Sequence, residues 1–495
     1  MTALVTTPFG AIEGTRQNGV CRFLGVPFAQ KPLGELRFRA PRLIEPWQGT
    51  LLADRFAKNP IQDNLQLGVE HYSEDCLYVN IWVPEGIQTP APVMVWVPGG
   101  AFSTGGSGAE TPDGPCMYDC QQMALDTGCI VVSLSYRLNT FGFLNLSEFS
   151  SRFDDHVGMK DIVMALRWIH EAIASFGGDA DNVTLFGESA GGEAISALLL
   201  VDEAKPYFHK AIIESNCFGS FYTVDEEREI CRKYLEYVGL DEQHVEELLD
   251  LPYDALIQAG RDLVTYVAEH YNGRCAFCPV VDGAFIRDFP TLADYTGLNK
   301  PILVGTNRSE GNFQALYSWP DEGKSAPLLL RRLTPERRAE LLACYPGLPS
   351  REAWGELLTD VMYAFPKIRF AERLSRGGET VYVYRFDYYT PVLESLGLYA
   401  CHVSELLPLF EFATGPYQPL YQGSEAEVHD IGTRMRRYWG AFARTGVPDV
   451  PGQAVWKPYT ETERNTLVID REDHLEVDPE EGIRIRYAGL DRLLL

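Results

Sequence analysis

The sequence contains no long, uninterrupted apolar stretch. No window of about 18 apolar residues occurs, so no segment is expected to cross a membrane as a helix. The first residues, "MTALVTTPFGAIEG", lack the basic and apolar regions of a secretory signal peptide. We therefore expect neither a membrane partner nor export.

Basic residues are scarce relative to acidic ones. The chain carries 43 Lys and Arg residues against 69 Asp and Glu residues, which gives a net charge of −26. So negative a chain repels phosphate groups, which argues against nucleic acid or an anionic membrane surface as a partner. A small-molecule substrate is the remaining class of partner, and the sequence does not decide between a monomer and a homo-oligomer.

Cysteine spacing gives little sign of a disulfide framework or a metal site. The 11 cysteines are an odd number spread along the chain, and Cys275 and Cys278 form one C-x-x-C pair without a second pair at zinc-ribbon spacing. We therefore expect no metal, reduced thiols and a cytoplasmic location.

Short apolar runs alternate with helical patterns along the chain. Continuous rather than alternating apolarity indicates strands covered on both faces, as in a parallel sheet. Such strands are predicted at 93–97, 129–136, 182–187, 210–215, 301–306 and 380–386. One amphipathic helix is expected to end at Gly177, and another before Gly446. The pattern predicts an α/β fold formed by one domain, residues 1–495, with helical insertions near 221–275 and 325–375.

The stretch "GESAGG", residues 187–192, follows a predicted strand and precedes a predicted helix. It places Ser189 in G-x-S-x-G, the turn on which α/β-hydrolases present a nucleophilic serine. Gly187 and Gly191 leave room for the strand and the helix to pass close to the serine, and the helix N-terminus favours developing negative charge. Ser189 is therefore the predicted nucleophile.

A serine hydroxyl needs a general base, and the base needs an acid that orients it. Both follow the serine along the chain in this fold, the acid first. His402 is favoured as the base because it follows the last predicted strand and its loop. The other histidines after the serine are His209, His244, His270, His429 and His474.

The acid is expected on a loop that leaves a strand between the serine and the base. Glu310 in "PILVGTNRSEGNF" satisfies this condition. Asp282 in "VVDG" is the alternative, with a structural Asp-Gly turn as its other explanation. The residues favour Glu310 and leave Asp282 open.

Several blocks between about residue 10 and about residue 460 match one family. They include "FLGVPFAQKPLGELRF", "SEDCLYVNIWVP", "FGGDADNVTLFGESAGG", "PVVDG", "GTNRSEG" and "ACHVSEL". Together they resemble the type B carboxylesterase (cholinesterase-like) family of α/β-hydrolases, and most of all its bacterial p-nitrobenzyl esterase kind. The resemblance implies a large, mostly parallel central sheet with helices on both faces. It also implies Glu310 as the acid, His402 as the base and a structural role for Asp282.

The glycine-rich stretch "PVMVWVPGGAFSTGG", residues 92–106, could serve a phosphate or an oxyanion. No lysine follows its glycines, which excludes a phosphate-binding P-loop. The letters "PGGAF" resemble the family's H-G-G-G-F, and this implies an oxyanion hole formed by the backbone N–H groups of Gly100, Ala101 and Ala190. Phe102 and Phe313 are predicted substrate-binding residues, with core packing as the alternative.

The chain departs from the family pattern at several positions. Pro60 stands where many relatives have the cysteine that pairs with the counterpart of Cys76, so Cys76 is expected to be unpaired. Ala101 and Val403 stand where the family commonly has glycine, and Asn216 also differs. These replacements are expected to reshape the pocket without touching the catalytic residues.

The combined prediction is a serine carboxylesterase that hydrolyses a small-molecule ester through an acyl-enzyme on Ser189, with no cofactor and no metal. One alternative is a serine hydrolase for amides or lipids. A non-catalytic binding relative is the less favoured alternative.

Overall fold

The computed structural model describes residues 2–62, 71–108, 117–271, 274–318, 330, 332–412 and 417–490, so residues 325–329 and 331 of the second expected insertion lie outside it. The chain divides into two compact units. The first comprises Met1–Lys210, Tyr222–Tyr266 and Cys275–Arg287, and the second comprises Ala211–Phe221, Val267–Arg274 and Asp288–Leu495.

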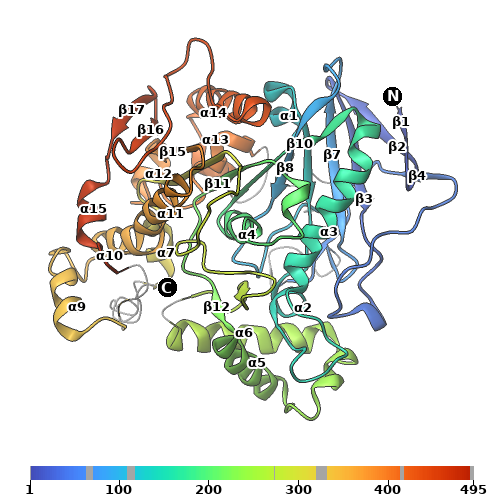
Figure 1. Cartoon of the computed structure of the whole chain (residues 1–495), viewed down its shortest axis with the longest axis horizontal. Helices are drawn as coiled ribbons and strands as arrows, with labels where there is room; N and C mark the ends of the chain where they lie inside the picture. Colours follow the sequence, from blue (N-terminus) through green and yellow to red (C-terminus); the bar gives the residue numbers. More distant parts are fainter. Residues whose placement is uncertain are drawn as a thin grey trace. The chain divides into compact units, whose positions relative to one another are not determined.

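The first unit is built on a mixed sheet (Figure 1). Its strands lie in the order β1 (Thr2–Thr7), β2 (Gly10–Gln17), β3 (Val20–Pro27), β7 (Tyr78–Pro84), β9 (Ile130–Leu134), β8 (Ala91–Val97) and β10 (Gly178–Glu188), with β4 (Thr50–Leu52) beside β2. β8 pairs in parallel with β9 and with β10, whereas β1, β2, β3, β7 and β9 follow one another antiparallel. Every residue of β8 and β9 is buried, as their continuous apolarity predicts. Two short pairs stand apart, β5 (Asn59–Pro60) with β6 (Tyr72–Ser73) and β12 (Tyr222–Thr223) with β13 (Val280–Val281).

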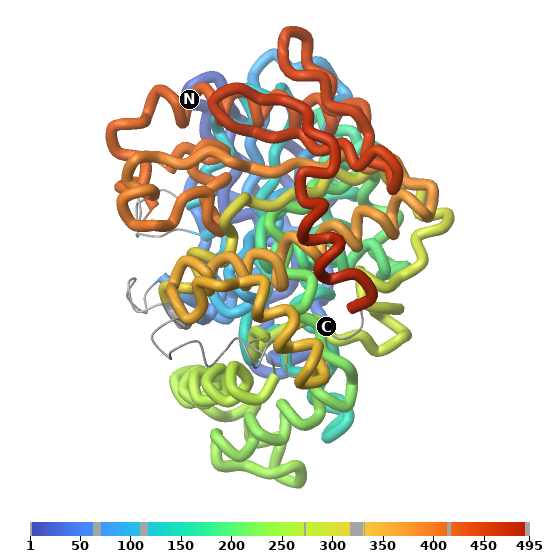
Figure 2. Tube along the Cα trace, turned by 90° about the vertical axis from the view of Figure 1, so that its left-hand side faces the viewer, coloured from blue at the N-terminus to red at the C-terminus, as the bar shows by residue number. Residues whose placement is uncertain are grey.

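In the first unit, a helix ends at the glycine that the sequence predicts as its cap. The predicted amphipathic helix runs as α3 and a 3-10 turn up to Gly177, whose φ of 87° ends it as a left-handed cap. In the insertion, α5 begins with a capping box between Thr223 and Glu226, and Tyr234 OH donates to the Leu256 carbonyl at 3.0 Å. This contact joins α5 to α6, which lie side by side in Figures 1 and 2. The helices are α1 (Gln121–Thr127), α2 (Asn139–Phe143), α3 (Val157–Ala172), α4 (Ala190–Leu198), α5 (Val224–Val238) and α6 (Tyr253–His270), the last continuing into the second unit.

The second unit contains a run of parallel strands. In order they are β11 (Lys210–Glu214), β14 (Ile302–Asn307), β15 (Val381–Phe386) and β16 (Asn465–Ile469), and β17 (His474–Val477) closes the run antiparallel. The helices are α7 (Gly311–Ser318), α9 (Pro335–Leu342), α10 (Arg351–Leu358), α11 (Phe365–Arg376), α12 (Pro391–Ser395), α13 (Leu406–Phe410), α14 (Glu425–Thr445) and α15 (Glu481–Arg486). A π-helical turn, Thr359–Ala364, separates α10 from α11.

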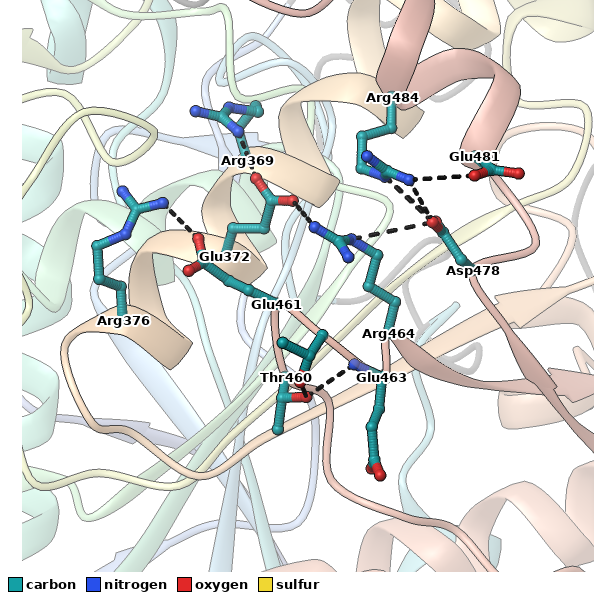
Figure 3. A network of polar contacts seen from close by, with 11 residues as sticks. Arg369, Glu372, Arg376, Thr460, Glu461, Glu463, Arg464, Asp478, Glu481 and Arg484 are labelled. Atoms are coloured by element: carbon teal, nitrogen blue, oxygen red, sulfur yellow. Dashed lines mark hydrogen bonds and ion pairs between the residues drawn. The ribbon is translucent and has the colours of Figure 1, made fainter.

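Ion pairs hold the last described elements of the chain to the rest of the second unit (Figure 3). Arg464, just before β16, pairs with Glu372 of α11 at 3.1 Å, and Arg484 of α15 pairs with Asp478 at 2.5 Å. Lys367 of α11 is buried and donates to the Glu480 carboxylate at 2.8 Å. In Figure 2 this last part of the chain, β16, β17 and α15, is the red end of the trace.

All of the predicted strands are present, with ends that differ by a few residues from the expected ones. The helix expected before Gly446 is α14, and Gly446 ends it with φ of 79°. Apolar periodicity and glycine caps are local signals, and they locate these elements well.

One buried carboxyl group of α5 makes stability depend on pH. Glu227 is buried, and its Oε1 atom accepts hydrogen bonds from Asn145 N–H at 3.1 Å and from the Cys231 thiol at 3.4 Å. Burial raises the pKa of Glu227 to about 8. The folded state therefore retains a proton that the unfolded chain releases above its ordinary pKa of about 4.3, and this carboxyl destabilises the fold increasingly as pH rises toward 8.

We expect Glu227→Gln, which mimics the protonated acid, to raise the melting temperature at pH 8 by at least about 2 °C. The gain should shrink as pH falls to 5. Thermal unfolding at the two pH values measures it, with the exposed Glu247→Gln as the matched control. An equal gain at both pH values would contradict a neutral Glu227.

Candidate active site

Ser189 occupies the sharp turn between β10 and α4. Its backbone has φ of 56° and ψ of −124°, and it is the N-cap residue of α4. Its carbonyl accepts a hydrogen bond from Glu193 N–H at 2.9 Å, which begins the helix. A non-glycine residue at positive φ is uncommon, and such strain concentrates at functional sites. The turn has the conformation of a nucleophile elbow.

Close backbone contacts require the glycines around this serine. A Cβ atom on Gly191 would lie 2.0 Å from the carbonyl oxygen of Val97, the last residue of β8, and one on Gly187 would lie 2.6 Å from the same oxygen. A Cβ atom on Gly99 would lie 3.2 Å from the Ser189 Cβ atom. The loop that follows β8 therefore lies directly against the serine turn.

That loop has a left-handed backbone over consecutive residues. Gly100, Ala101 and Phe102 have φ of 114°, 54° and 54°. The Gly100 carbonyl accepts the N–H of Thr104 at 2.9 Å, which closes the loop into a tight turn. Ala101 is exposed, whereas Ala190 is buried at the first position of α4.

Contacts from the segment after β9 fix the two ends of this loop. Tyr136 OH donates to the Pro98 carbonyl at 2.8 Å, and Asn139 N–H donates to the Phe102 carbonyl at 2.6 Å. Pro98 can accept this hydrogen bond because a proline keeps its backbone carbonyl.

In the second unit, Glu310 and His402 form a buried pair. Glu310 is fully buried, and its Oε2 atom lies 2.8 Å from Nδ1 of His402. Its other oxygen accepts the N–H of Asn307 at 2.7 Å. A carboxylate that accepts at Nδ1 keeps the imidazole proton on that nitrogen, so Nε2 is left to take up a proton. The pair has the arrangement of a general base with its orienting acid.

Hydrogen bonds join the two loops that carry this pair. Ser309 N–H donates to the Ala400 carbonyl at 2.8 Å, and the Asn307 side-chain amide donates to the Cys401 carbonyl at 2.8 Å. The loops leave the carboxyl ends of the neighbouring parallel strands β14 and β15. Parallel pairing therefore brings together two residues that are far apart in the sequence.

Two further buried carboxyl groups lie in the same region of the second unit. Glu405 accepts a hydrogen bond from Ser215 Oγ, and burial together with repulsion from Glu310 raises the pKa of Glu405. Glu214 accepts from Trp439 Nε1 at 2.9 Å, and burial raises the pKa of Glu214 to about 8. Both shifts favour the neutral form, which limits the negative charge around the imidazole of His402.

The alternative acid, Asp282, lies in the first unit and caps a turn. Its Oδ1 atom accepts N–H groups of Ala284, Phe285 and Ile286 at 3.0, 2.9 and 3.0 Å. Its Oδ2 atom lies 3.1 Å from Nε2 of His156. Burial opposes ionisation of this carboxyl, but the hydrogen bonds from His156 and the backbone outweigh it and lower the pKa of Asp282.

The other candidate histidines differ from His402 in their contacts and exposure. His209 accepts the N–H of Val183 on its Nδ1 atom at 3.1 Å. His244 and His429 are exposed, each beside a surface carboxylate at 2.7 and 3.0 Å. Exposure and surface pairing are the settings of solvated histidines.

The two predicted substrate-binding aromatics differ in their surroundings. Phe102 is fully buried, and its ring packs 4.5 Å from that of Phe143. Phe313, on α7, is half-buried with its ring 6.2 Å from that of His402. Phe102 therefore packs against another aromatic ring, whereas Phe313 lies beside the imidazole.

Two neighbours of the imidazole, Tyr363 and Glu405, are not among the site residues predicted from the sequence. Tyr363 of the π-helical turn is buried, and its ring centroid lies 5.1 Å from that of His402. No local pattern marks this tyrosine. Glu405 had a signal, because it lies in the block "ACHVSEL", three residues after His402.

A serine on a strained strand-to-helix turn and a buried acid–histidine pair are features of serine hydrolases. The family described as the carboxylesterase family matches residues 1–339 and 347–482. The chain belongs to this family. It is a serine-dependent carboxylic ester hydrolase, as the combined sequence prediction states.

Individual relatives agree with the family. The para-nitrobenzyl esterase of Bacillus subtilis (strain 168) is 35% identical over 96% of each chain, and the liver carboxylesterase of Sus scrofa is 29% identical over 92% of this chain and 86% of that protein. A solved structure of a PNB esterase aligns with a TM-score of 0.84 at 32% identity, over 98% of this chain and 99% of the other. A Geobacillus stearothermophilus carboxylesterase aligns with a TM-score of 0.83 at the same identity and coverage. The chain has the α/β-hydrolase fold, as predicted.

Across the described ranges, every helix is too short or too polar to span a bilayer.

The left-handed loop leads to a prediction about Ala101. Its φ of 54° costs an alanine about 1 kcal/mol relative to glycine, so Ala101→Gly should keep esterase turnover within about threefold and leave the melting temperature unchanged or higher. Ala101→Pro should lower turnover by at least about 10²-fold and destabilise the loop, because proline fixes φ near −65° and lacks the N–H group. Turnover of p-nitrophenyl acetate and thermal unfolding measure both effects. Full activity of Ala101→Pro would contradict this loop conformation.

Proposed function

We propose that Ser189 is the nucleophile, His402 its general base and Glu310 the acid that orients the base. The N–H groups of Gly100, Ala101 and Ala190 form the oxyanion hole in this proposal. The single-domain organisation and roles for Phe102 and Phe313 beside the substrate belong to the same proposal.

The buried Glu310–His402 hydrogen bond gives the proposal its main support. It fixes the tautomer that a base toward a hydroxyl group requires, and the positive φ of Ser189 is what an exposed nucleophile on an elbow requires. The membership of the chain in the carboxylesterase family supports the same residues.

In the first half of the reaction, Ser189 Oγ attacks the ester carbonyl while His402 Nε2 takes the hydroxyl proton. The carbonyl oxygen becomes an oxyanion, and backbone N–H groups stabilise it where its charge develops. The imidazolium, held by Glu310, gives its proton to the leaving alcohol, and the acyl-enzyme remains. Water then attacks the acyl group by the same route and releases the carboxylic acid.

The proposed substrate class rests on a relative of this chain. Because a related protein is a para-nitrobenzyl esterase, we include small esters of aromatic alcohols among the substrates of this chain.

No disulfide joins the cysteines within the described part of the chain, and Cys76 is buried. This supports the proposed location in the reducing cytoplasm.

Three variants test the assignment on p-nitrophenyl esters. Ser189→Ala should lose on the order of 10⁶-fold in kcat, and Glu310→Gln about 10³–10⁴-fold, because the imidazole loses its tautomer control. Asp282→Asn should keep kcat within about tenfold and mainly lower stability, since Asp282 caps a turn. The kcat per folded molecule, with circular dichroism as the folding control, distinguishes them. A larger loss in Asp282→Asn than in Glu310→Gln would restore Asp282 as the acid.

A further inference from the structure

A π-helical turn lies beside the catalytic imidazole. Thr359–Ala364 interrupts the helix between α10 and α11, and Phe365 N–H donates to the Asp360 carbonyl five residues earlier. Such a turn fits one residue more than an α-helical turn, is rare, and recurs at functional sites. The reaction proposed above assigns no role to this turn.

Tyr363 is the residue of this turn that meets the base. Its side chain is buried, and its ring lies 5.1 Å from the His402 ring at an interplanar angle of 44°. Its hydroxyl accepts a hydrogen bond from the Gln314 side chain on α7. The ring of Tyr363 thus contacts His402 while its hydroxyl is fixed by Gln314.

The same turn is tied to the acid. Gly311 N–H, directly after Glu310, donates to Thr359 Oγ1 at 2.9 Å, and Thr359 in turn donates to the Gly355 carbonyl at 2.8 Å. A Cβ atom on Gly311 would lie 2.3 Å from the Gly355 carbonyl oxygen, so α7 and α10 are in backbone contact here. Acid, turn, tyrosine and base thus form a closed ring of contacts.

The outer side of the turn is also fixed. Asp360 accepts hydrogen bonds from Tyr345 OH and from Arg486 at 2.6 Å, and Tyr345 OH contacts Tyr487 OH at 2.7 Å. These bonds link the turn to α15 and the residue after it. A segment anchored on both sides can hold a ring at a set distance from the imidazole.

We infer that Tyr363 is a positioning residue that fixes the imidazole of His402 and stabilises its charged form during turnover. The inference rests on the proposed role of His402 as the base. A ring face within about 6 Å of a cation attracts it, and the imidazole becomes a cation when it accepts the serine proton. Two carboxyl groups act on the imidazole from its own loops: Glu310 through the hydrogen bond to Nδ1, and Glu405, whose raised pKa favours its neutral form. Both are common to every variant below.

Tyr363→Leu, which keeps apolar volume and removes the ring, is the decisive variant. We expect its kcat to fall by roughly 10–10²-fold with KM changed less than about threefold, because a displaced base slows chemistry more than binding. The midpoint of the acidic limb of kcat/KM should move to lower pH by roughly 0.5–1 unit, because the imidazolium loses the ring that stabilised it. Tyr363→Phe keeps the ring and should stay within about threefold of wild type in kcat.

Phe370→Leu is the matched control. Phe370 is a buried aromatic of the next helix, α11, and packs on Phe218 at 4.6 Å and on Tyr295 at 5.6 Å. Its loss should lower the melting temperature and leave kcat and the pH profile unchanged. Equal kinetic losses in Phe370→Leu and Tyr363→Leu, or a wild-type profile in Tyr363→Leu, would overturn the inference.

Ser189→Ala and His402→Ala, measured alongside, separate this inference from the proposed function. If both abolish turnover while Tyr363→Leu behaves as wild type, only the role of Tyr363 fails. If turnover persists without Ser189 or His402, the proposed function fails first.

Discussion

An imidazole can act as a base at a chosen nitrogen only if something holds its proton on the other one. The hydrogen bond from His402 Nδ1 to Glu310 does this, and much of the second unit serves it. β14 and β15 pair in parallel, so the loops at their carboxyl ends meet and exchange hydrogen bonds. The absence of side chains at Gly311 and Gly355 lets α7 and α10 approach behind the acid. Burial raises the pKa of Glu405 and of Glu214, which favours their neutral forms and limits the negative charge in this region.

The proposed nucleophile, Ser189, depends on a different constraint, which is a strained backbone. Ser189 and the loop after β8 both have positive φ, and so does Val403 next to the base, with φ of 75°. The family pattern that the sequence resembles leads us to expect glycine at positions 101 and 403, whereas this chain has Ala101 and Val403. A β-branched residue at positive φ is a genuine outlier, and it persists only where the surrounding structure over-determines the backbone. Rigid surroundings, more than flexible glycines, hold these turns.

The sequence predicted those features that short local patterns of residues specify. Apolar runs, glycine caps and the strand-turn-helix context placed the strands and Ser189. Residues alone left Glu310 and Asp282 open, because each carboxylate meets its histidine only in the folded chain. Glu310 contacts His402, 92 positions away, and Asp282 contacts His156, 126 positions away. The Ser215–Glu405 hydrogen bond spans 190 positions, and Tyr363 reaches the base through a π-helical turn that has no sequence signature. Long-range contacts of this kind depend on how strands pair and helices pack.

The central claim is that one serine, activated by one histidine, forms the acyl-enzyme. Titration with diethyl p-nitrophenyl phosphate, which phosphorylates activated serines, tests it most directly when combined with peptide mass mapping. The account predicts that about one equivalent abolishes esterase turnover, that the adduct lies on the peptide containing Ser189, and that His402→Ala forms it far more slowly. An adduct on another residue with complete loss of turnover, or full turnover after Ser189 is modified, would contradict it.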